Sequence, residues 1–213
     1  TEPNLYDLPV LTTWSEDGGP FITMGQVYTQ SLDGTKQNLG MYRLQVYDKN
    51  RLGMHWQIHK DSAHFFHEYK KAGQKMPVSV AIGGDPLYIW CGQAPMPIGM
   101  FELLLYGFIK EKSARLVKSL TNPIYIPEDV DMVIEGWVDP ANMEIEGPFG
   151  DHLGYYSLKH LFPLMKVRNV YHRKNAIWSF TVVGRPPQED TSFGALIHEI
   201  TGSAIPKEIP GLH

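Results

Sequence analysis

The chain carries short apolar runs separated by residues that favour turns. Val, Ile, Tyr and Trp are concentrated in runs that predict strands, at residues 41–48, 78–82, 132–138, 166–172 and 177–183. The 20 glycines and 16 prolines are scattered between these runs as turn signals. The pattern therefore predicts many short strands joined by turns.

Three segments have the features of helices. Residues 61–73 begin with an acidic cap at Asp61, carry lysines in the last turn and end at Gly73. Residues 99–118 and 193–201 are the other helical stretches. Runs of strands with helices set apart from them favour an α+β fold around an antiparallel sheet or partly open barrel. The sequence contains no GxGxxG or P-loop motif, so a dinucleotide-binding fold has no local support.

Composition narrows the class of protein. Of 213 residues, 43% are hydrophobic and 20% charged, as in an ordinary globular domain, and the net charge of -4 argues against a nucleic-acid partner. A single cysteine, Cys91, excludes a disulfide framework within the chain. The most apolar run, residues 100–109, is too short for a membrane span, and the start of the chain lacks signal-peptide features. We therefore expect a cytoplasmic protein.

Two carboxylates stand five residues apart in the segment Glu146-Gly-Pro-Phe-Gly-Asp151. In a straight strand, positions five apart face opposite sides of the sheet, but the Gly-Pro-Phe-Gly turn can bring both carboxylates into one cavity. Burial and mutual repulsion would then raise the pKa of one acid enough to make it a proton donor. A solvated surface turn is the alternative interpretation.

Arg43 ends the segment Asn38-Leu-Gly-Met-Tyr-Arg43 and lies in a predicted strand whose alternation places Arg43 and Gln45 on one face. A guanidinium is well shaped to hold a carboxylate through two hydrogen bonds. An ordinary surface charge is the other interpretation of this residue.

Histidines and one isolated acid are the candidate metal ligands. His55, His59, His64 and His67 lie close together in the sequence without an HExxH arrangement. Glu102 is the one charge in the apolar segment 97–106, where an unpaired buried carboxylate would be costly. A metal or a cationic partner would satisfy Glu102, and partial exposure on an amphipathic helix is the alternative. The tryptophans at 56, 90, 137 and 178 are expected in the core.

The segments 38–43, 54–60, 97–102 and 146–157 occur in an order that resembles the UbiD family of reversible decarboxylases. The most specific are Asn-Leu-Gly-Met-Tyr-Arg and Glu-Gly-Pro-Phe-Gly-Asp-His-Leu-Gly-Tyr-Tyr-Ser. The resemblance covers nearly the whole chain. It implies that residues 1–213 form a central domain with an antiparallel split β-barrel of the FMN-binding type and peripheral helices. Such a domain binds prenylated FMN.

The resemblance also assigns a metal site and cofactor contacts. It implies that Mn²⁺ or another divalent ion, with K⁺ nearby, is bound by Asn38, His59 and Glu102. An amide, an imidazole and a carboxylate suit manganese or magnesium better than a structural zinc site. The same three residues are expected to contact the cofactor, together with Met41, Tyr42, Arg43, Ile58 and Pro95.

By the same resemblance, Arg43, Glu146 and Asp151 are catalytic, and CO2 leaves an aromatic or α,β-unsaturated acid through a covalent adduct with prenylated FMN. We expect Arg43 to orient the substrate carboxylate and to keep Glu146 ionised. Burial and a neighbouring negative charge are expected to raise the pKa of Asp151, which would make it the proton donor. Asp151 departs from members that carry Glu here, and His55 is interpreted as structural.

Chains of this family are longer, with a preceding α/β domain and a following oligomerisation domain. The sequence is therefore expected to be a fragment of a homo-oligomer that receives its cofactor from a flavin prenyltransferase. Quinone biosynthesis is one role that the family covers. Two other functions remain open: an FMN-binding flavin reductase, which would not need Arg43 or the two acids, and a non-catalytic assembly module.

Overall fold

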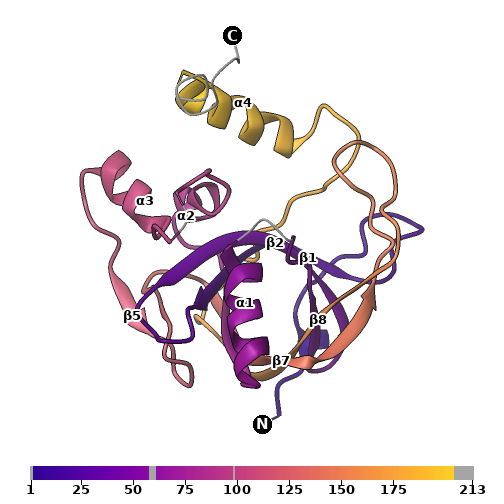
Figure 1. Ribbon diagram of the computed structural model, residues 1–213. Helices are drawn as coiled ribbons and strands as arrows, with labels where there is room; N and C mark the ends of the chain where they lie inside the picture. The colour runs from indigo at the N-terminus through magenta and orange to yellow at the C-terminus, as the bar shows by residue number, and fades with distance from the viewer. Residues whose placement is uncertain (1, 58–60, 98, 204–213) are drawn as a thin grey trace.

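Six antiparallel strands form a closed barrel in the computed structural model of the chain, which describes residues 2–57, 61–97 and 99–203 (Figure 1). Around the barrel the order is β1-β2-β3-β8-β7-β4. The strands are β1 (Phe21–Gln30), β2 (Gln37–Asp48), β3 (Arg51–Met54), β4 (Met76–Ile82), β7 (Met132–Glu146) and β8 (His160–His172). Mixed α and β structure around an antiparallel barrel confirms the predicted fold class.

Alternation along the barrel strands creates two hydrophobic cores. Val27 in β1, Val80 in β4 and Ile134 in β7 belong to a core that includes side chains of the first helix. Their sequence neighbours Tyr28, Ala81 and Val133 belong to the second core. Because successive side chains of a strand point to opposite faces, the wall of the barrel is buried on both sides here.

The helices cover the barrel from different directions. They are α1 (Asp61–Ala72), α2 (Pro86–Cys91), α3 (Leu103–Lys110) and α4 (Glu189–Thr201), with the 3-10 turn η1 (Leu5–Asp7) near the start. In Figure 1, α1 lies across the barrel, α2 and α3 lie together beside it, and α4 stands apart near the end of the chain. A small two-stranded sheet, β5 (Leu116–Lys118) with β6 (Tyr125–Pro127), adjoins the second core.

The helix ends explain two differences from the predicted boundaries. The helix expected over residues 99–118 is only α3, because Glu111 adopts a left-handed conformation (φ 51°) and the chain then enters β5. The helix expected over residues 193–201 begins earlier, at Glu189. Gln188 and Thr191 form a reciprocal capping box there, which satisfies backbone N–H groups at the helix start.

The predicted strand over residues 177–183 is wrong. No strand is assigned to this segment, and the six barrel strands already pair with each other in a closed ring that offers no free edge. The backbone of Thr181 bonds instead to the side chain of Thr23, whose hydroxyl accepts from its N–H (3.0 Å) and donates to its carbonyl (2.9 Å). The segment is therefore tied to β1 without joining the sheet.

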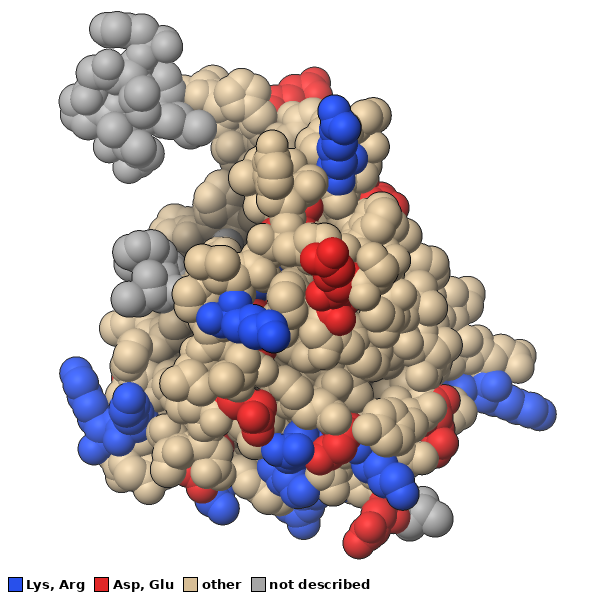
Figure 2. Space-filling view, turned by 90° about the vertical axis from the view of Figure 1, so that its right-hand side faces the viewer, with Lys and Arg blue, Asp and Glu red and all other residues tan. Residues whose placement is uncertain are grey.

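The surface carries charges of both signs. Figure 2 shows Lys and Arg side chains interspersed with Asp and Glu side chains, mostly over the lower part of the face in view. Within the described part of the chain, no helix has the length and apolar character needed to cross a bilayer. Trp56 and Trp90 are buried in the two cores, as expected, whereas Trp137 and Trp178 are only partly buried.

Candidate active site

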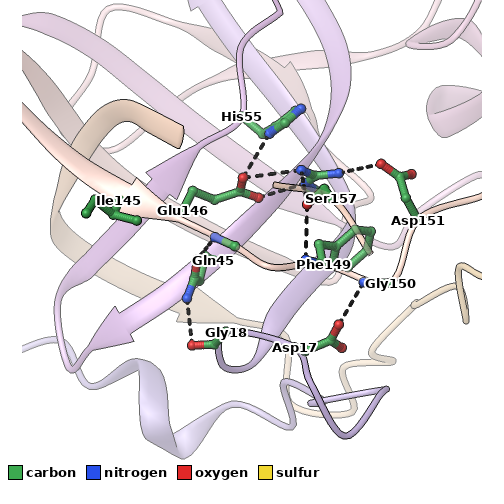
Figure 3. Close-up of polar contacts among 12 residues, drawn as sticks. Asp17, Gly18, Gln45, His55, Ile145, Glu146, Phe149, Gly150, Asp151 and Ser157 are labelled. Atoms are coloured by element: carbon green, nitrogen blue, oxygen red, sulfur yellow. Dashed lines mark hydrogen bonds and ion pairs between the residues drawn. The ribbon is translucent and has the colours of Figure 1, made fainter. Parts of the chain in front are cut away.

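Arg43 is the centre of a buried polar cluster beside one end of the barrel. It stands in β2 between the buried side chains of Tyr42 and Leu44, and its own side chain is 11% exposed. Its guanidinium donates to Glu146 through Nε (2.7 Å) and Nη2 (3.2 Å), and to Asp151 through Nη1 (2.8 Å). The Phe149 ring lies 4.7 Å below the guanidinium carbon, which adds a cation–π contact. These contacts fix the arginine in one orientation, and Figure 3 labels its partners Glu146, Asp151 and Ser157.

Glu146 is the last residue of β7, and its side chain is fully buried. Besides the two bonds from Arg43, its Oε2 lies 3.2 Å from Nδ1 of His55. Burial acts to raise the pKa of Glu146, but hydrogen bonds from His55 and Arg43 and their charges outweigh burial, so the pKa is lowered from its ordinary value. Glu146 is therefore a carboxylate at neutral pH.

The loop after Glu146 is fixed by contacts at its base. Gly147 has a φ of 98°, which favours glycine, and its N–H donates to Oε1 of Gln45 at 2.8 Å. The Ser157 hydroxyl accepts from the N–H of Phe149 (3.1 Å) and from Nη2 of Arg43 (3.3 Å). The N–H of Gly150 donates to Oδ1 of Asp17 at 2.8 Å. Residues before and after the turn thereby hold Asp151 next to Arg43 (Figure 3).

Asp151 is the more accessible of the two acids, with 32% of its side chain exposed. Its Oδ1 accepts from the backbone N–H of His152 and contacts Nδ1 of the same residue, both at 2.8 Å. Burial acts to raise the pKa of Asp151, but these bonds and the charge of Arg43 outweigh it, so the pKa is lowered. The expected rise of the Asp151 pKa is therefore wrong for the chain without a substrate, because the acid has cationic and donor neighbours.

A cavity of about 350 Å³ opens beside this cluster. Met41, Tyr42 and Arg43, three of the residues expected to contact the cofactor, line it from β2. The other side includes Phe193 and Ile197 of α4. Asp151 and His55 also line the cavity, whereas Glu146 is buried behind them. The lining mixes apolar side chains with polar and charged ones, and a concave site with convergent polar groups is typical of small-molecule binding.

One expected metal ligand, Glu102, contacts the backbone next to another, Asn38. Asn38 and Glu102 are both buried, and the N–H of Leu39 donates to Oε2 of Glu102 at 2.6 Å, which places this carboxylate against the peptide that follows Asn38. The side-chain amide of Asn38 donates to Oγ of Ser62 at 3.0 Å. His59 lies outside the described residues. Among those described, no three His, Cys, Asp and Glu side chains are grouped to hold a metal ion, so the three-residue site stays a prediction.

The remaining expected contacts differ in outcome. Ile58 lies outside the described residues, and Pro95 is exposed, two residues after Gln93, which lines the cavity. The sequence assigned no contact in the cluster to His55, Ser157 or Gln45. His55 was interpreted as structural, Ser157 ends one of the matching motifs, and strand alternation places Gln45 on the same face as Arg43. The roles of His55 and Ser157 depend on contacts between segments about 90 or more residues apart.

Comparisons with known proteins agree with this fold. The UbiD family model, described as the 3-octaprenyl-4-hydroxybenzoate carboxy-lyase Rift-related domain, matches residues 1–186. An uncharacterized protein of Helicobacter pylori strain J99 is 59% identical over 211 residues, which are 99% of this chain and 34% of that protein. The chain thus spans about a third of the length of that relative.

Two solved structures have the same architecture. Vanillic acid decarboxylase of Sedimentibacter hydroxybenzoicus in its closed form matches with a TM-score of 0.89 and 29% identity, covering 92% of this chain and 43% of that one. An evolved dimeric form of the UbiD-class enzyme HmfF from Pelotomaculum thermopropionicum, in complex with prFMN, matches with a TM-score of 0.89 and 28% identity. This second match covers 98% of this chain and 48% of that chain.

Proposed function

The chain belongs to the UbiD family of carboxy-lyases, and from this membership we propose that it is the cofactor-binding part of a decarboxylase. The proposed reaction removes CO2 from an aromatic or α,β-unsaturated carboxylic acid with the help of prenylated FMN. The observation that carries the proposal is Arg43, held between Glu146 and Asp151 at the edge of a cavity. A flavin reductase would not require this arginine or either acid.

The cavity fits a flat, partly polar cofactor. Its volume of about 350 Å³ is in the range of small-molecule sites, and its lining combines Met41, Tyr42 and Phe193 with the polar side chains of Gln57 and Gln93. One matched structure is a complex with prFMN, which supports the same cofactor here. When bound, prenylated FMN would supply the electron sink that stabilises the electron pair left by the departing CO2.

Arg43 has little hydrogen-bonding capacity left for a substrate. Four of the five guanidinium N–H groups that an arginine carries are engaged, two by Glu146, one by Asp151 and one by Ser157. The sequence suggested that Arg43 binds a substrate carboxylate through two hydrogen bonds. In the structure, this two-point contact is made with Glu146. An incoming carboxylate can take the remaining N–H of Nη1 and compete with Asp151 for this nitrogen.

Competition for Arg43 between Asp151 and the substrate carboxylate would allow Asp151 to become protonated. In the free chain, Arg43 favours ionised Asp151. A substrate carboxylate bound at Arg43 adds a negative charge near Asp151 and weakens its ion pair, and both effects raise the pKa of an acid. Asp151 then takes up a proton and donates it to the carbon from which CO2 has left. The C–C bond breaks, its electron pair ends in the new C–H bond, and CO2 is the second product.

Further parts of the proposal concern the whole protein. Mn²⁺ is proposed as the ion at Asn38 and Glu102 because amide and carboxylate oxygens suit a hard divalent cation, with His59 as third ligand and K⁺ nearby. An aromatic acid is favoured by the family description and by the match to vanillic acid decarboxylase. The remaining proposals are a homo-oligomer in the cytoplasm, a flavin prenyltransferase as cofactor supplier, and a role in quinone biosynthesis.

The test uses the full-length chain, produced with and without a flavin prenyltransferase. We expect a prenylated-flavin absorbance spectrum only in the first preparation, together with CO2 release from at least one aromatic or unsaturated acid. Release of no CO2 by chain that has bound prenylated FMN and Mn²⁺ would contradict the decarboxylase function. NAD(P)H-dependent FMN reduction in its place would favour the reductase.

A further inference from the structure

Asp151 has hydrogen-bond donors on both of its oxygens. Oδ2 accepts from Nη1 of Arg43 at 2.8 Å, and Figure 3 shows the carboxylate directed at the guanidinium. Oδ1 accepts from the backbone N–H of His152 at 2.8 Å, and Nδ1 of the same histidine lies 2.8 Å from this oxygen. In the proposed reaction Asp151 gives up one proton per turnover, so solvent has to replace that proton at a carboxylate surrounded by these donors.

The three donors differ in whether they can give their hydrogen away. A guanidinium stays protonated in proteins, and a backbone N–H is not among the groups that ionise. An imidazole exchanges protons with water near neutral pH, and its two nitrogens allow it to take up a proton on one and donate from the other. Among the described residues, His152 is therefore the contact of Asp151 that can pass a proton on.

The orientation of His152 suits this transfer in either charge state of the ring. Asp151 is ionised in the free chain because its pKa is lowered, so its oxygens only accept hydrogen bonds. Nδ1 consequently carries a hydrogen toward Oδ1 in the neutral imidazole as well as in the imidazolium. With 56% of its side chain exposed, His152 is open to solvent, and it also lines the 350 Å³ cavity. One residue thus connects bulk water with the proposed proton donor.

We propose that His152 relays protons from solvent to Asp151 during decarboxylation. This inference rests on the proposed function, which assigns the proton transfer to Asp151. When the substrate carboxylate weakens the pair with Arg43, the Nδ1–H bond of His152 breaks and an O–H bond forms on Asp151. In a neutral ring, Nε2 binds a solvent proton in the same step, whereas an imidazolium is recharged from solvent afterwards. One solvent proton is consumed for each C–C bond that becomes CO2 and a C–H bond.

The competing interpretation is that water protonates Asp151 directly and that His152 only holds the carboxylate in place. A second cavity of about 170 Å³, which Asp151 also lines, offers such a route. The variant His152→Asn separates the two roles, because an asparagine keeps the backbone N–H and can donate from its amide but cannot take up a proton. His67→Asn is the matched control, since His67 is exposed on α1 and does not line the active-site cavity.

The first experiment measures hydrogen exchange at the product carbon, with the full-length chain loaded with prenylated FMN and Mn²⁺. Phenol, the product expected from 4-hydroxybenzoate, is incubated in deuterated solvent. If that acid releases no CO2, the first acid of the panel that does takes its place. Exchange requires Asp151 to lose a proton to solvent and to regain a deuteron. The rate should be unchanged in His67→Asn and about 10- to 100-fold lower in His152→Asn, less than for loss of the proton donor itself because water still reaches Asp151.

The second experiment distinguishes a relay from a structural support. His152→Ala removes the imidazole and leaves an opening at an exposed position. Free imidazole can then carry protons to Asp151, so the exchange rate should rise with imidazole concentration in this variant and stay constant in the unaltered chain. Pyrazole has nearly the same size and the same N–H donor but is a far weaker base, and it should give no such rise. His67→Ala is the matched control.

Three results would overturn the inference. Unchanged exchange in His152→Asn would show that water protonates Asp151 directly. Exchange in His152→Ala that imidazole does not accelerate, or that pyrazole accelerates equally, would make His152 a structural support, as would loss of bound flavin from both variants. Failure of the proposed function looks different, because the unaltered chain would then show neither CO2 release nor exchange with any acid of the panel, and the relay would be removed together with the function.

Discussion

Arg43 and Glu146 are 103 residues apart in the sequence and are joined by two hydrogen bonds, at 2.7 and 3.2 Å. The contact connects β2 to the end of β7, strands that are not neighbours in the barrel. A buried ion pair loses hydration on both sides and is stable only where further hydrogen bonds satisfy both groups, as His55, Ser157 and Asp151 do here. The pair therefore serves to orient the site.

Arg43→Lys should severely impair decarboxylation although the charge is retained. A lysine ammonium cannot reproduce the two-point contact with Glu146 together with the bond to Asp151. We expect turnover to fall by about a hundredfold or more, as for other small misplacements of catalytic groups. Arg51→Lys is the matched control, because Arg51 also contacts two carboxylates but lies at the surface, where such pairs contribute little. Near-normal turnover in Arg43→Lys would contradict the orienting role.

In Glu146→Gln, the free energy of unfolding should change less with pH in the acid range than it does in the unaltered chain. The pKa of Glu146 is lowered in the folded chain, so its ionised form contributes stability above the pKa of the unfolded state, about 4.3 for a glutamate. This contribution is lost as the pH falls through the lower, folded pKa. Urea unfolding of the full-length chain at several pH values measures the slope below about pH 4.3. Equal slopes for variant and unaltered chain would show that Glu146 is not preferentially ionised in the fold.

Asp151→Asn should bind the cofactor and metal but turn over very slowly. The amide has nearly the shape of the acid, and Asp151 is not among the proposed metal ligands. Loss of a positioned proton donor typically lowers a rate by about a hundredfold to ten-thousandfold. Rates of CO2 release and of hydrogen exchange at the product carbon in deuterated solvent provide the measurement. Normal exchange in an active variant would assign the donor role to another group or to water.

Substrate binding should be accompanied by proton uptake at Asp151. The acid is ionised in the free chain at neutral pH because its pKa is lowered, and a bound carboxylate should raise that pKa. Calorimetric titration with an unreactive carboxylate analogue, in buffers of different ionisation enthalpy, measures the protons taken up. We expect net uptake by the unaltered chain and little by Asp151→Asn. Equal uptake in both would place the proton elsewhere.

Glu102→Gln should weaken Mn²⁺ binding while preserving the local fold. The glutamine oxygen can still accept from the N–H of Leu39, but the ligand charge is lost. Mutation of a residue that contacts a metal ligand, and not the metal itself, typically lowers metal affinity by about 10- to 100-fold. Mutation of a direct ligand should lower the Mn²⁺ affinity more. Metal content and Mn²⁺ titration of the full-length chain are the measurements, with exposed Glu199→Gln as control. Unchanged affinity in Glu102→Gln would exclude Glu102 as a ligand.

Elements with a clear local signal could be predicted from the sequence. The helix expected over residues 61–73 is α1, and four of the five strand runs lie in β2, β4, β7 and β8. β1 was not predicted, because Gln26 and Thr29 are polar yet fully buried in it. Their side chains bond to Gly83 and Ser62, in segments far along the chain. These partners come close to β1 only in the folded barrel. In the sequence, the two polar residues therefore interrupt the apolar pattern that would have predicted a buried strand.

Site residues could be predicted from the sequence only where they lie in a motif that resembles the family. By residue type alone, Arg43, Glu146 and Asp151 could have been surface residues. The family resemblance predicted that they form one site, and in the structure Arg43 contacts both acids. It could not indicate the ionisation of Asp151, because that depends on His152 and on how Arg43 divides its hydrogen bonds. His55 was interpreted as structural, and its contact with Glu146 joins segments 91 residues apart, which no local pattern indicates.

The two acids are attached to different kinds of element. Glu146 ends a long barrel strand, where backbone hydrogen bonds to β8 limit displacement, whereas Asp151 is carried by a surface loop. Loops open at a lower free-energy cost than core strands. Because loops also tolerate substitution better than the elements they connect, residues around Asp151 can change while Arg43 and Glu146 keep their places in the barrel strands.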